Sequence, residues 1–329
     1  MTAPHNTILL GDAATRLREL PAASVDCVIT SPPYYRLRDY GVAGQLGLEP
    51  TVDAWVENLR AVCGELARVL KPTGSLWLNL GDAYSRAPRY GAPPKSLFLA
   101  PERLLVALAA DGWIVRNKVV WAKTNPMPET VMDRLTTAHD AVYFLTRSPR
   151  YFFDLDAVRL PFRHDASSAA ILDAEVDWRG GNPGDVWHLP RASLRAHGAT
   201  FPVQLVEWPL LATCPERVCA RCSAPWLRWP GRSVVIGKRR RQPHVGFVRR
   251  YDAHWRVART LGRLAPGCGC RAGTRLGLVL DPFSGTGTVG VVAQQHGRDW
   301  LGIEINPAYV RLAERRLAAN APPGLERAA

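Results

Sequence analysis

The chain has 329 residues, a hydrophobic content of 47% and a formal net charge of +13 at pH 7. This length and apolar content can supply the core of one large α/β domain or two smaller ones. No apolar run approaches the roughly 18 residues that cross a bilayer, and the first residues lack the charged-then-apolar plan of a signal peptide. We therefore expect a globular, cytoplasmic protein without membrane contact.

The N-terminal half alternates segments of strand and helix character. Residues 25–30 form an apolar run typical of a buried strand, and residues 52–70 carry apolar side chains at helical spacing. Lys71-Pro72-Thr73-Gly74 ends this helix. Such alternation predicts a mostly parallel sheet covered by helices on both faces. The further elements predicted here are strands at 75–80 and 114–123, a helix at 97–110 and a hairpin at 141–154.

The second half is less regular. Residues 161–200 are rich in Gly, Asp, Arg and Pro and are predicted to be irregular, whereas residues 202–213 are predicted to be helical. Segment 276–320 then has the pattern strand, glycine turn, helix, strand, helix. Residues 321–329 are expected to form a loose tail.

The positive charge is concentrated between Cys214 and Arg275. This segment has 15 Lys or Arg and only two acidic residues, Glu216 and Asp252, so its excess equals that of the whole chain. Dense basic segments bind nucleic acid because phosphate contacts release counterions; a solvated loop is the alternative. With the aromatic residues interleaved among them, the expected DNA contacts are Lys238, Arg239, Arg240, Arg241, Arg249 and Arg250.

Seven cysteines in a chain without an export signal do not suggest a disulfide framework. Two close pairs, Cys219 with Cys222 and Cys268 with Cys270, lie in the basic segment. Four thiolates can hold one tetrahedral zinc ion, so we expect a structural zinc, with free thiols or a redox pair as the alternative. Cys27 and Cys63 are predicted to be core residues.

A glycine turn follows the strand LGLVL. Gly285, Gly287 and Gly290 match GxGxxG, and Glu304 ends the next predicted strand. This pattern is a weak dinucleotide fingerprint when it stands alone. It is not a phosphate loop, because no lysine follows the last glycine.

The segment DPFSGTGTVG resembles the cofactor motif of class I S-adenosylmethionine-dependent methyltransferases. The resemblance implies that Glu304 binds the ribose hydroxyls of the cofactor. It also implies that the loop shapes the pocket for the amino-acid part of the cofactor; the loop residues are Asp281, Pro282, Phe283, Ser284, Gly285, Thr286, Gly287 and Thr288.

The segment TSPPY resembles the catalytic motif of methyltransferases that act on base amino groups in DNA. It precedes the cofactor loop, which is the permuted order of the β class of these enzymes. Further similar segments are LARVLKPTGSLWLNLGD, VVWAKTNPMP, RLTTAHDAVYFLTRSPRYFFD and HGATFPVQLVE. The resemblance therefore implies a Rossmann-like α/β methyltransferase fold in permuted order, with the basic cysteine segment as an insert.

The chemistry of amino-group methylation explains the motif. A base amino group is a poor nucleophile, and two acceptors aimed at its N–H bonds can localise its lone pair. Ser31 Oγ and the Pro32 carbonyl are expected to be these acceptors, Pro33 stiffens the loop, and Tyr34 stacks on the extruded base. Methylation of cytosine carbon 5 is disfavoured, because that reaction uses a Pro-Cys motif that the chain lacks.

The target base is the finer question. In the family that the motif resembles, Ser at the first position usually accompanies cytosine N4, and Asp adenine N6. We therefore expect a site-specific cytosine-N4 methyltransferase, with adenine N6 as the alternative. A catalytically silent, zinc-containing DNA-binding protein is an alternative of another class. A nicotinamide oxidoreductase would leave the double proline without a role.

Several other residues have two interpretations. Asp12 resembles an acid that contacts the adenine end of the cofactor, but it can equally be a helix N-cap. Phe201, with His197 and Pro202, resembles a segment that closes over the methionine part of the cofactor, or is structural. Residues that could belong to the active-site wall or contact phosphates, or have no such role, are Trp121, Lys123, Asn125, Arg36 and Arg38.

The expected organisation follows from these segments. Residues 1–160 form the catalytic half of the methyltransferase domain, 201–213 and 276–320 its cofactor half, and 214–275 the insert. Residues 161–200 are a candidate for target recognition. The expected partner is double-stranded DNA, and the resemblance adds a homodimer and a cognate restriction endonuclease that acts on the same site.

Overall fold

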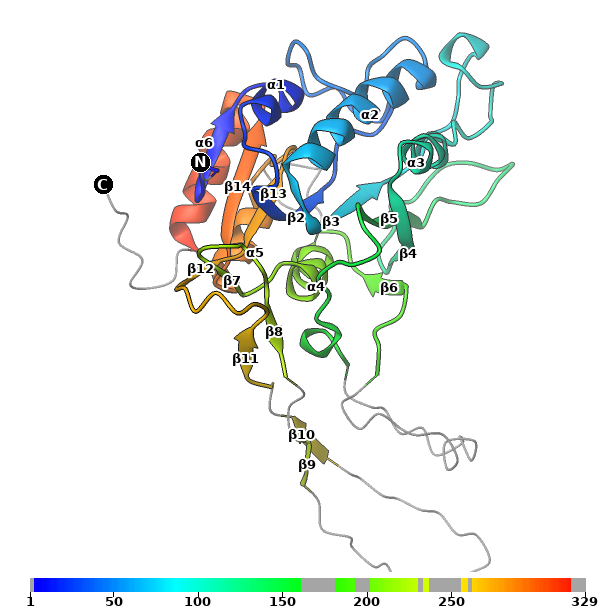
Figure 1. Cartoon of the computed structure of the whole chain (residues 1–329). Helices are drawn as coiled ribbons and strands as arrows, with labels where there is room; N and C mark the ends of the chain where they lie inside the picture. The colour runs from blue at the N-terminus through cyan, green and yellow to red at the C-terminus, as the bar shows by residue number, and fades with distance from the viewer. Residues whose placement is uncertain are drawn as a thin grey trace, which may run out of the picture.

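Eight strands from both halves of the chain form the central sheet (Figure 1). The computed structural model describes residues 3–160, 181–192, 202–229 and 262–320, together with the backbone of 233–236 and 256–259. The order across the sheet is β1-β14-β13-β2-β3-β5-β4-β6. Its strands are β1 (Thr7–Leu10), β2 (Val25–Thr30), β3 (Leu70–Leu80), β4 (Ile114–Lys123), β5 (His139–Thr146), β6 (Val186–Leu189), β13 (Leu278–Asp281) and β14 (Asp299–Glu304).

Parallel pairing dominates the sheet. The neighbours β1, β14, β13, β2 and β3 are parallel, and β6 is parallel to β4. Only β5, which lies between β3 and β4, is antiparallel to its two neighbours among the strands described in this sheet. The prediction of a mostly parallel sheet is therefore confirmed.

The hairpin predicted for residues 141–154 is wrong. The first half of this segment is β5, and both edges of β5 are already paired, to β3 and β4. The aromatic residues that suggested a second strand lie on the face of the sheet instead. The rings of Tyr151 and Phe153 pack on Phe144 of β5, with centroids 5.6 and 5.8 Å away.

The stretch predicted to be irregular contains a strand, which is a second correction. β6 pairs with β4 through residues 186–189. Trp187 and Leu189 are buried while Val186 and His188 are exposed, and this alternation is the period of a strand with one face on the core. The four residues of β6 lie among Gly, Asp and Pro residues. An alternation of only four residues was too short to be recognised as a strand in the sequence.

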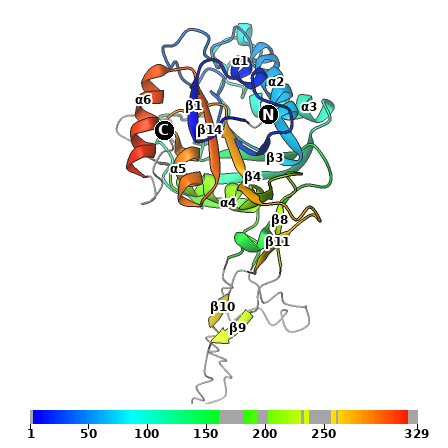
Figure 2. The same cartoon turned by 60° about the vertical axis from the view of Figure 1, so that its left-hand side comes forward.

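Helices cover both faces of the sheet, as predicted (Figures 1 and 2). The apolar stripe predicted for 52–70 is buried in helix α2, where Trp55, Leu59 and Leu66 are at most 1% exposed. No helix in the described ranges is long and apolar enough to cross a membrane. One face carries α1 (Ala13–Arg18), α2 (Val52–Val69) and α3 (Ala100–Ala110), and the other carries α4 (Val203–Thr213), α5 (Thr288–Gln295) and α6 (Pro307–Ala319).

The described strands between residues 217 and 276 leave the sheet as nested antiparallel pairs. The strands β8 to β11 extend away from the sheet on the side of α4 in both views (Figures 1 and 2). We call the fully described part of this segment, 217–229 and 262–276, the cysteine lobe. The pairs are β7 (Arg217–Cys219) with β12 (Thr274–Leu276), β8 (Trp226–Arg228) with β11 (Leu264–Pro266), and β9 (Ser233–Ile236) with β10 (Arg256–Arg259).

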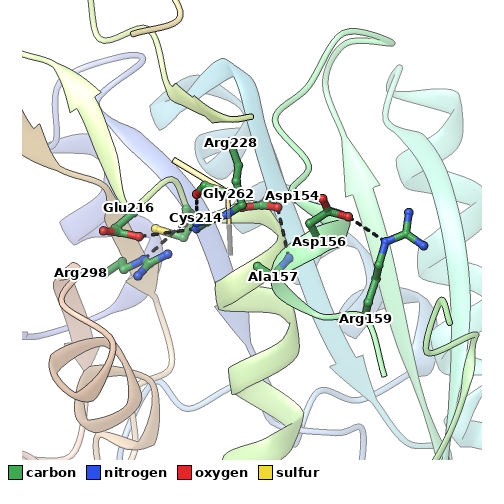
Figure 3. Close-up of polar contacts among 9 residues, drawn as sticks. All are labelled: Asp154, Asp156, Ala157, Arg159, Cys214, Glu216, Arg228, Gly262 and Arg298. Carbon is green, nitrogen blue, oxygen red and sulfur yellow. Dashed lines mark hydrogen bonds and ion pairs between the residues drawn. The ribbon is translucent and has the colours of Figure 1, made fainter. Parts of the chain in front are cut away.

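Arg228 anchors the cysteine lobe to the sheet domain (Figure 3). Its Nε donates to Asp154 Oδ2 at 2.7 Å, and its guanidinium also lies 3.6 Å from Glu216 and donates to the Gly262 carbonyl at 3.0 Å. The side chains of Arg228 and Asp154 are only 10% and 9% exposed. The backbone N–H of Asp154 donates to Ala212 at the end of α4 (2.8 Å). Charge-assisted bonds in so buried a place fix the base of the lobe against the sheet.

Candidate active site

β2 ends in Ser31-Pro32-Pro33-Tyr34, at the edge of the sheet formed by the carboxyl ends of its parallel strands. Ligands of open α/β sheets bind at this edge. The loop is held firmly, because Trp55 Nε1 donates to the Pro33 carbonyl at 3.0 Å. The prolines restrict the backbone further. A core strand thus ends directly in a rigid loop.

Asn79, near the end of β3, holds Ser31 and Tyr34 together. Its Nδ2 donates to Tyr34 Oη at 2.9 Å and to Ser31 Oγ at 3.2 Å. The residue is 5% exposed, and its Oδ1 has no hydrogen-bond partner among the described residues. Sequence analysis missed Asn79. The available signal was one polar side chain in the apolar run SLWLNL.

Tyr34 is restrained on another side by Asp140 of β5. Tyr34 Oη donates to Asp140 Oδ2 at 3.5 Å, and Lys123 Nζ donates to Asp140 Oδ1 at 2.7 Å. Gly81 permits this approach, because a Cβ at that position would lie 2.7 Å from the Tyr34 ring. Burial, and then the negative charge of Asp140, raise the pKa of Tyr34. Its hydroxyl therefore stays protonated at neutral pH.

The glycine turn lies beside this loop, because β13 is the sheet neighbour of β2. Gly287 is the N-cap of α5 with φ +76°, in the left-handed region that favours glycine. Glu304, at the end of β14, accepts the backbone N–H groups of Gly285 and Asn306, both at 2.8 Å. Burial raises the pKa of Glu304. The turn and the acid of the fingerprint are therefore in direct contact.

Asp281 connects the two loops. Its Oδ1 accepts from Thr30 Oγ1 at 2.7 Å and from the Phe283 backbone N–H at 3.1 Å. The residue is 2% exposed, and burial raises its pKa to about 7. Asp281 thus lies behind the surface and ties the end of β2 to the glycine turn.

A pocket opens between the glycine turn and the loop after β2; we call it the glycine-turn pocket. Of the predicted cofactor residues, Asp281 and Gly287 lie outside its lining. Those that line it are Asp12, Pro282, Phe283, Ser284, Gly285, Thr286, Thr288 and Glu304, with Ser31 and Pro33 from the proline loop. Lining residues that sequence analysis missed are Gly11, Ala13, Tyr40, Gly44, Gln45, Leu46, Ile305, Asn306 and Tyr309.

Asp12 is confirmed as a helix N-cap, and its contact with the cofactor stays a prediction. It lines the glycine-turn pocket, and its carboxylate also caps α1 by accepting the backbone N–H of Thr15 at 2.9 Å. The cap uses Oδ1 of Asp12. A capping role therefore does not exclude a contact in the pocket.

A wider depression, the proline-motif cleft, lies next to the same loop. Trp121 and Lys123 line it, whereas the Oδ1 of Asn125 accepts the backbone N–H of Arg191 at 2.6 Å. Its other lining residues include Ser31, Pro32, Tyr34, Asn79 and Asp140, and its basic ones include Arg36, Arg38, Arg86 and Arg191. Basic side chains can contact the phosphates of a nucleic acid strand, and a rigid aromatic loop beside them can stack on its bases.

The two cysteine pairs come together at the base of the cysteine lobe. The Sγ atoms of Cys219, Cys222, Cys268 and Cys270 all lie within 4.8 Å of one another. In a tetrahedral zinc–thiolate site with Zn–S bonds of about 2.3 Å, the sulfur atoms are about 3.8 Å apart. The cluster can thus hold such an ion after a small contraction. Cys27 and Cys63 are buried as predicted.

Some predicted site residues lie outside the described residues. They are Phe201, His197 and the expected DNA contacts Lys238, Arg239, Arg240, Arg241, Arg249 and Arg250. Pro202, next to Phe201, is described and is the N-cap residue of α4.

Comparison with known proteins agrees with this geometry. The family model described as DNA methylase matches residues 25–217 and 274–315. The chain is 34% identical to the type II methyltransferase M.Cfr9I of Citrobacter freundii, over 94% of this chain and 87% of that protein. It is 35% identical to the type II methyltransferase M.XycI of Xanthomonas campestris pv. cyanopsidis, over 95% of this chain and 87% of that protein.

The fold has a counterpart among solved structures. The PvuII DNA methyltransferase, described as cytosine-N4-specific, aligns with a TM-score of 0.60 and 18% identity, over 99% of this chain and 89% of that one. The extent of the family match, the relatives and the fold lead to one conclusion: the chain belongs to the DNA methylase family of N6 and N4 amino-methyltransferases.

Proposed function

We propose that the chain transfers a methyl group from S-adenosylmethionine to the N4 amino group of a flipped cytosine in double-stranded DNA. The observation that carries the proposal is the position of Ser31, which lines both the glycine-turn pocket and the proline-motif cleft. Serine at the first position of this motif supports cytosine as the target. The PvuII enzyme, a structural neighbour, is itself named cytosine-N4-specific.

The proline loop would activate the amino group. Ser31 Oγ and the Pro32 carbonyl accept hydrogen bonds from its two N–H groups. These bonds localise the nitrogen lone pair as attack begins. Tyr34, whose hydroxyl is held by Asn79 and Asp140, offers a fixed ring face to the extruded base. The nitrogen would gain the methyl group as the methyl–sulfur bond of the donor breaks and S-adenosylhomocysteine leaves. The nitrogen would then release one proton to solvent, so no covalent intermediate with the enzyme is needed.

The glycine-turn pocket suits the methyl donor. S-adenosylmethionine, when bound, supplies a methyl group activated by a positively charged sulfur. Each Glu304 oxygen accepts one backbone N–H, which leaves lone pairs for the ribose hydroxyls. Ser284 and Thr286 add polar groups for the amino-acid part, and Ile305 adds apolar surface. A mixed polar and apolar lining of this kind fits a charged nucleoside.

Methyl transfer to unmethylated DNA from a radiolabelled donor tests this assignment. Wild-type protein is expected to label DNA, and Ser31→Ala is expected to lose about 100-fold or more of the rate, the usual effect of removing one preorganised electrostatic group. Ser24→Ala is the matched control, because Ser24 Oγ donates to the Pro21 carbonyl away from the pocket and cleft. A Ser31→Ala rate equal to wild type would refute the role of Ser31.

We also propose that the four clustered cysteines hold a structural zinc ion. They lie between the pairs β7–β12 and β8–β11, so an ion there would close the base of the basic insert. Mass-spectrometric metal analysis should find about one zinc per chain. Cys222→Ala should lose it, whereas Cys63→Ala, which removes a buried thiol of α2, should keep it. A wild-type protein refolded with zinc and still free of it would contradict the site.

We propose that the basic insert, residues 214–275, binds DNA. Its net charge equals that of the whole chain, and Arg228 fixes its base to the sheet domain. We assign residues 1–160 to catalysis, 201–213 and 276–320 to the cofactor, 214–275 to DNA contact and 161–200 to target recognition. The type II relatives support a restriction-modification role with a cognate endonuclease.

A further inference from the structure

The glycine-turn pocket and the proline-motif cleft meet at one place. Among the described residues, Ser31 and Tyr40 are the two whose side chains line both. Tyr34 lines the cleft, and Tyr309 of α6 lines the pocket. A methyl group that passes from one space to the other must therefore pass Ser31 and Tyr40. Ser31 has a role in the proposed reaction, whereas Tyr40 has none so far.

Tyr40 is held in place without a ligand. Gln45 closes the loop around it: its Oε1 accepts the backbone N–H of Tyr40 at 2.8 Å, and its Nε2 donates to the Arg38 carbonyl at 3.4 Å. The Tyr40 ring also meets the Tyr309 ring edge to face, with centroids 6.4 Å apart and an interplanar angle of 86°. Backbone and ring are thus both restrained, so little ordering is needed when ligands bind.

The surroundings of Tyr40 favour a neutral ring. Burial raises the pKa of its hydroxyl, and the charge of Arg38 offsets only part of this effect. A neutral aromatic face attracts a cation such as a sulfonium group. The same face, or its edge, packs well against a nucleobase. One side chain can therefore contact both of the molecules that react.

We propose that Tyr40 is a wall shared by the methyl donor and the extruded base, and that it couples their binding. The inference rests on the proposed methyl transfer to a DNA base. Each ligand covers part of the ring and excludes water from it, so the second ligand meets a surface that is already desolvated and fixed. Because coupling between two sites is reciprocal, donor and base each strengthen the binding of the other.

The test measures binding of S-adenosylhomocysteine to the full chain, alone and with a short duplex. The duplex contains a site that the wild type methylates, and a matched duplex carries an abasic sugar in place of the target. In the wild type, S-adenosylhomocysteine is expected to bind about 10-fold more tightly with the duplex that contains the target base than with the abasic duplex. This factor is within the usual range of allosteric coupling. Tyr40→Ala is expected to reduce this factor below about 2-fold, and Tyr40→Phe to keep it.

Two matched variants separate coupling from simple loss of a contact. Phe283→Ala should weaken S-adenosylhomocysteine binding but keep the coupling factor, because Phe283 lines the pocket and not the cleft. Tyr40→Leu keeps an apolar side chain larger than that of Ala but without an aromatic face, so it should fold and still lose coupling. Thermal melting by circular dichroism checks the fold of each variant.

The outcomes distinguish this inference from the proposed function. Coupling retained in Tyr40→Ala overturns the role of Tyr40, while methyl transfer by the wild type still stands. If the wild type methylates no DNA, the proposed function fails. In that case unchanged S-adenosylhomocysteine affinity in Tyr40→Ala overturns the donor contact as well.

Discussion

The hydroxyl of Thr30 donates a 2.7 Å hydrogen bond to the buried carboxylate of Asp281. These residues end β2 and β13, two neighbouring parallel strands. Thr30 directly precedes Ser31, and Asp281 opens the glycine turn. One hydrogen bond therefore sets the spacing between the loop that carries the proposed acceptors and the loop that lines the proposed donor pocket.

Removing this bond should weaken both the fold and the pocket. Thr30→Val leaves the Asp281 carboxylate buried with one donor fewer, and such a loss costs about 1–3 kcal/mol. Thr30→Ser keeps the hydroxyl and is the matched control. Urea unfolding and titration with S-adenosylhomocysteine measure the two effects. Equal values for Thr30→Val and Thr30→Ser would show that the bond does not matter.

The raised pKa of Asp281 predicts a pH dependence of stability. A carboxyl group with a pKa of about 7 in the folded chain, but about 3.9 when unfolded, binds more protons in the folded state between these values. The contribution of Asp281 to the free energy of unfolding should therefore fall as the pH rises from about 4 to 7, by at most about 4 kcal/mol. Asp281→Asn keeps an Oδ1 acceptor for Thr30 and cannot ionise, so it should lack this fall.

Urea unfolding of both ligand-free proteins between pH 4.5 and 8.5 checks this prediction. The Asp281→Asn variant should be the more stable at pH 8, and the difference should shrink toward pH 4.5. Curves that run parallel across the whole range would show that Asp281 ionises normally in the folded chain.

Asn79 should affect the rate of methyl transfer but not the binding of the methyl donor. Asn79→Leu removes the Nδ2 donor to Ser31 and Tyr34, so both side chains lose their orientation. We expect the transfer rate to fall by about 100-fold, as for loss of a preorganised polar group, with S-adenosylhomocysteine affinity nearly unchanged. Asn58→Leu is the control, since Asn58 pairs with Glu49 on the surface. A normal rate for Asn79→Leu would exclude this role.

Arg228 should control the order of the cysteine lobe. Arg228→Met leaves the Asp154 carboxylate buried and unpaired, a change that typically costs about 3–5 kcal/mol. Hydrogen exchange should accelerate in β8 and β11. Arg217→Met removes the same charge from an exposed residue of the lobe, so it should not accelerate this exchange. Equal exchange in the two variants would argue against the anchor.

Much of the fold was predictable because its signals are local. The end of β2 just before Ser31, the apolar stripe of α2 and the strand ending at Glu304 each appear within one continuous stretch of sequence. The strand β6 and the structure of the segment after β5 were not predictable in this way. Strand pairing is decided by which strand edges are free. No local pattern states that both edges of β5 are occupied.

The candidate site was predictable to the same extent. Residues inside the two motifs line the pocket or the cleft, or lie directly behind them. Tyr40 and Tyr309 reach the pocket through tertiary packing of a loop on α6, and Asn79 reaches Ser31 across neighbouring strands. Such contacts depend on the folded chain, so the sequence alone did not indicate them.

The identity of the methylated base tests the proposed activity. The protein is incubated with S-adenosylmethionine and unmethylated genomic DNA, which is then digested to nucleosides and examined by mass spectrometry. We predict N4-methylcytosine, which Ser31→Ala should form about 100-fold or more slowly. N6-methyladenine would contradict the assignment of the base, and the absence of any methylated nucleoside would contradict the proposed activity.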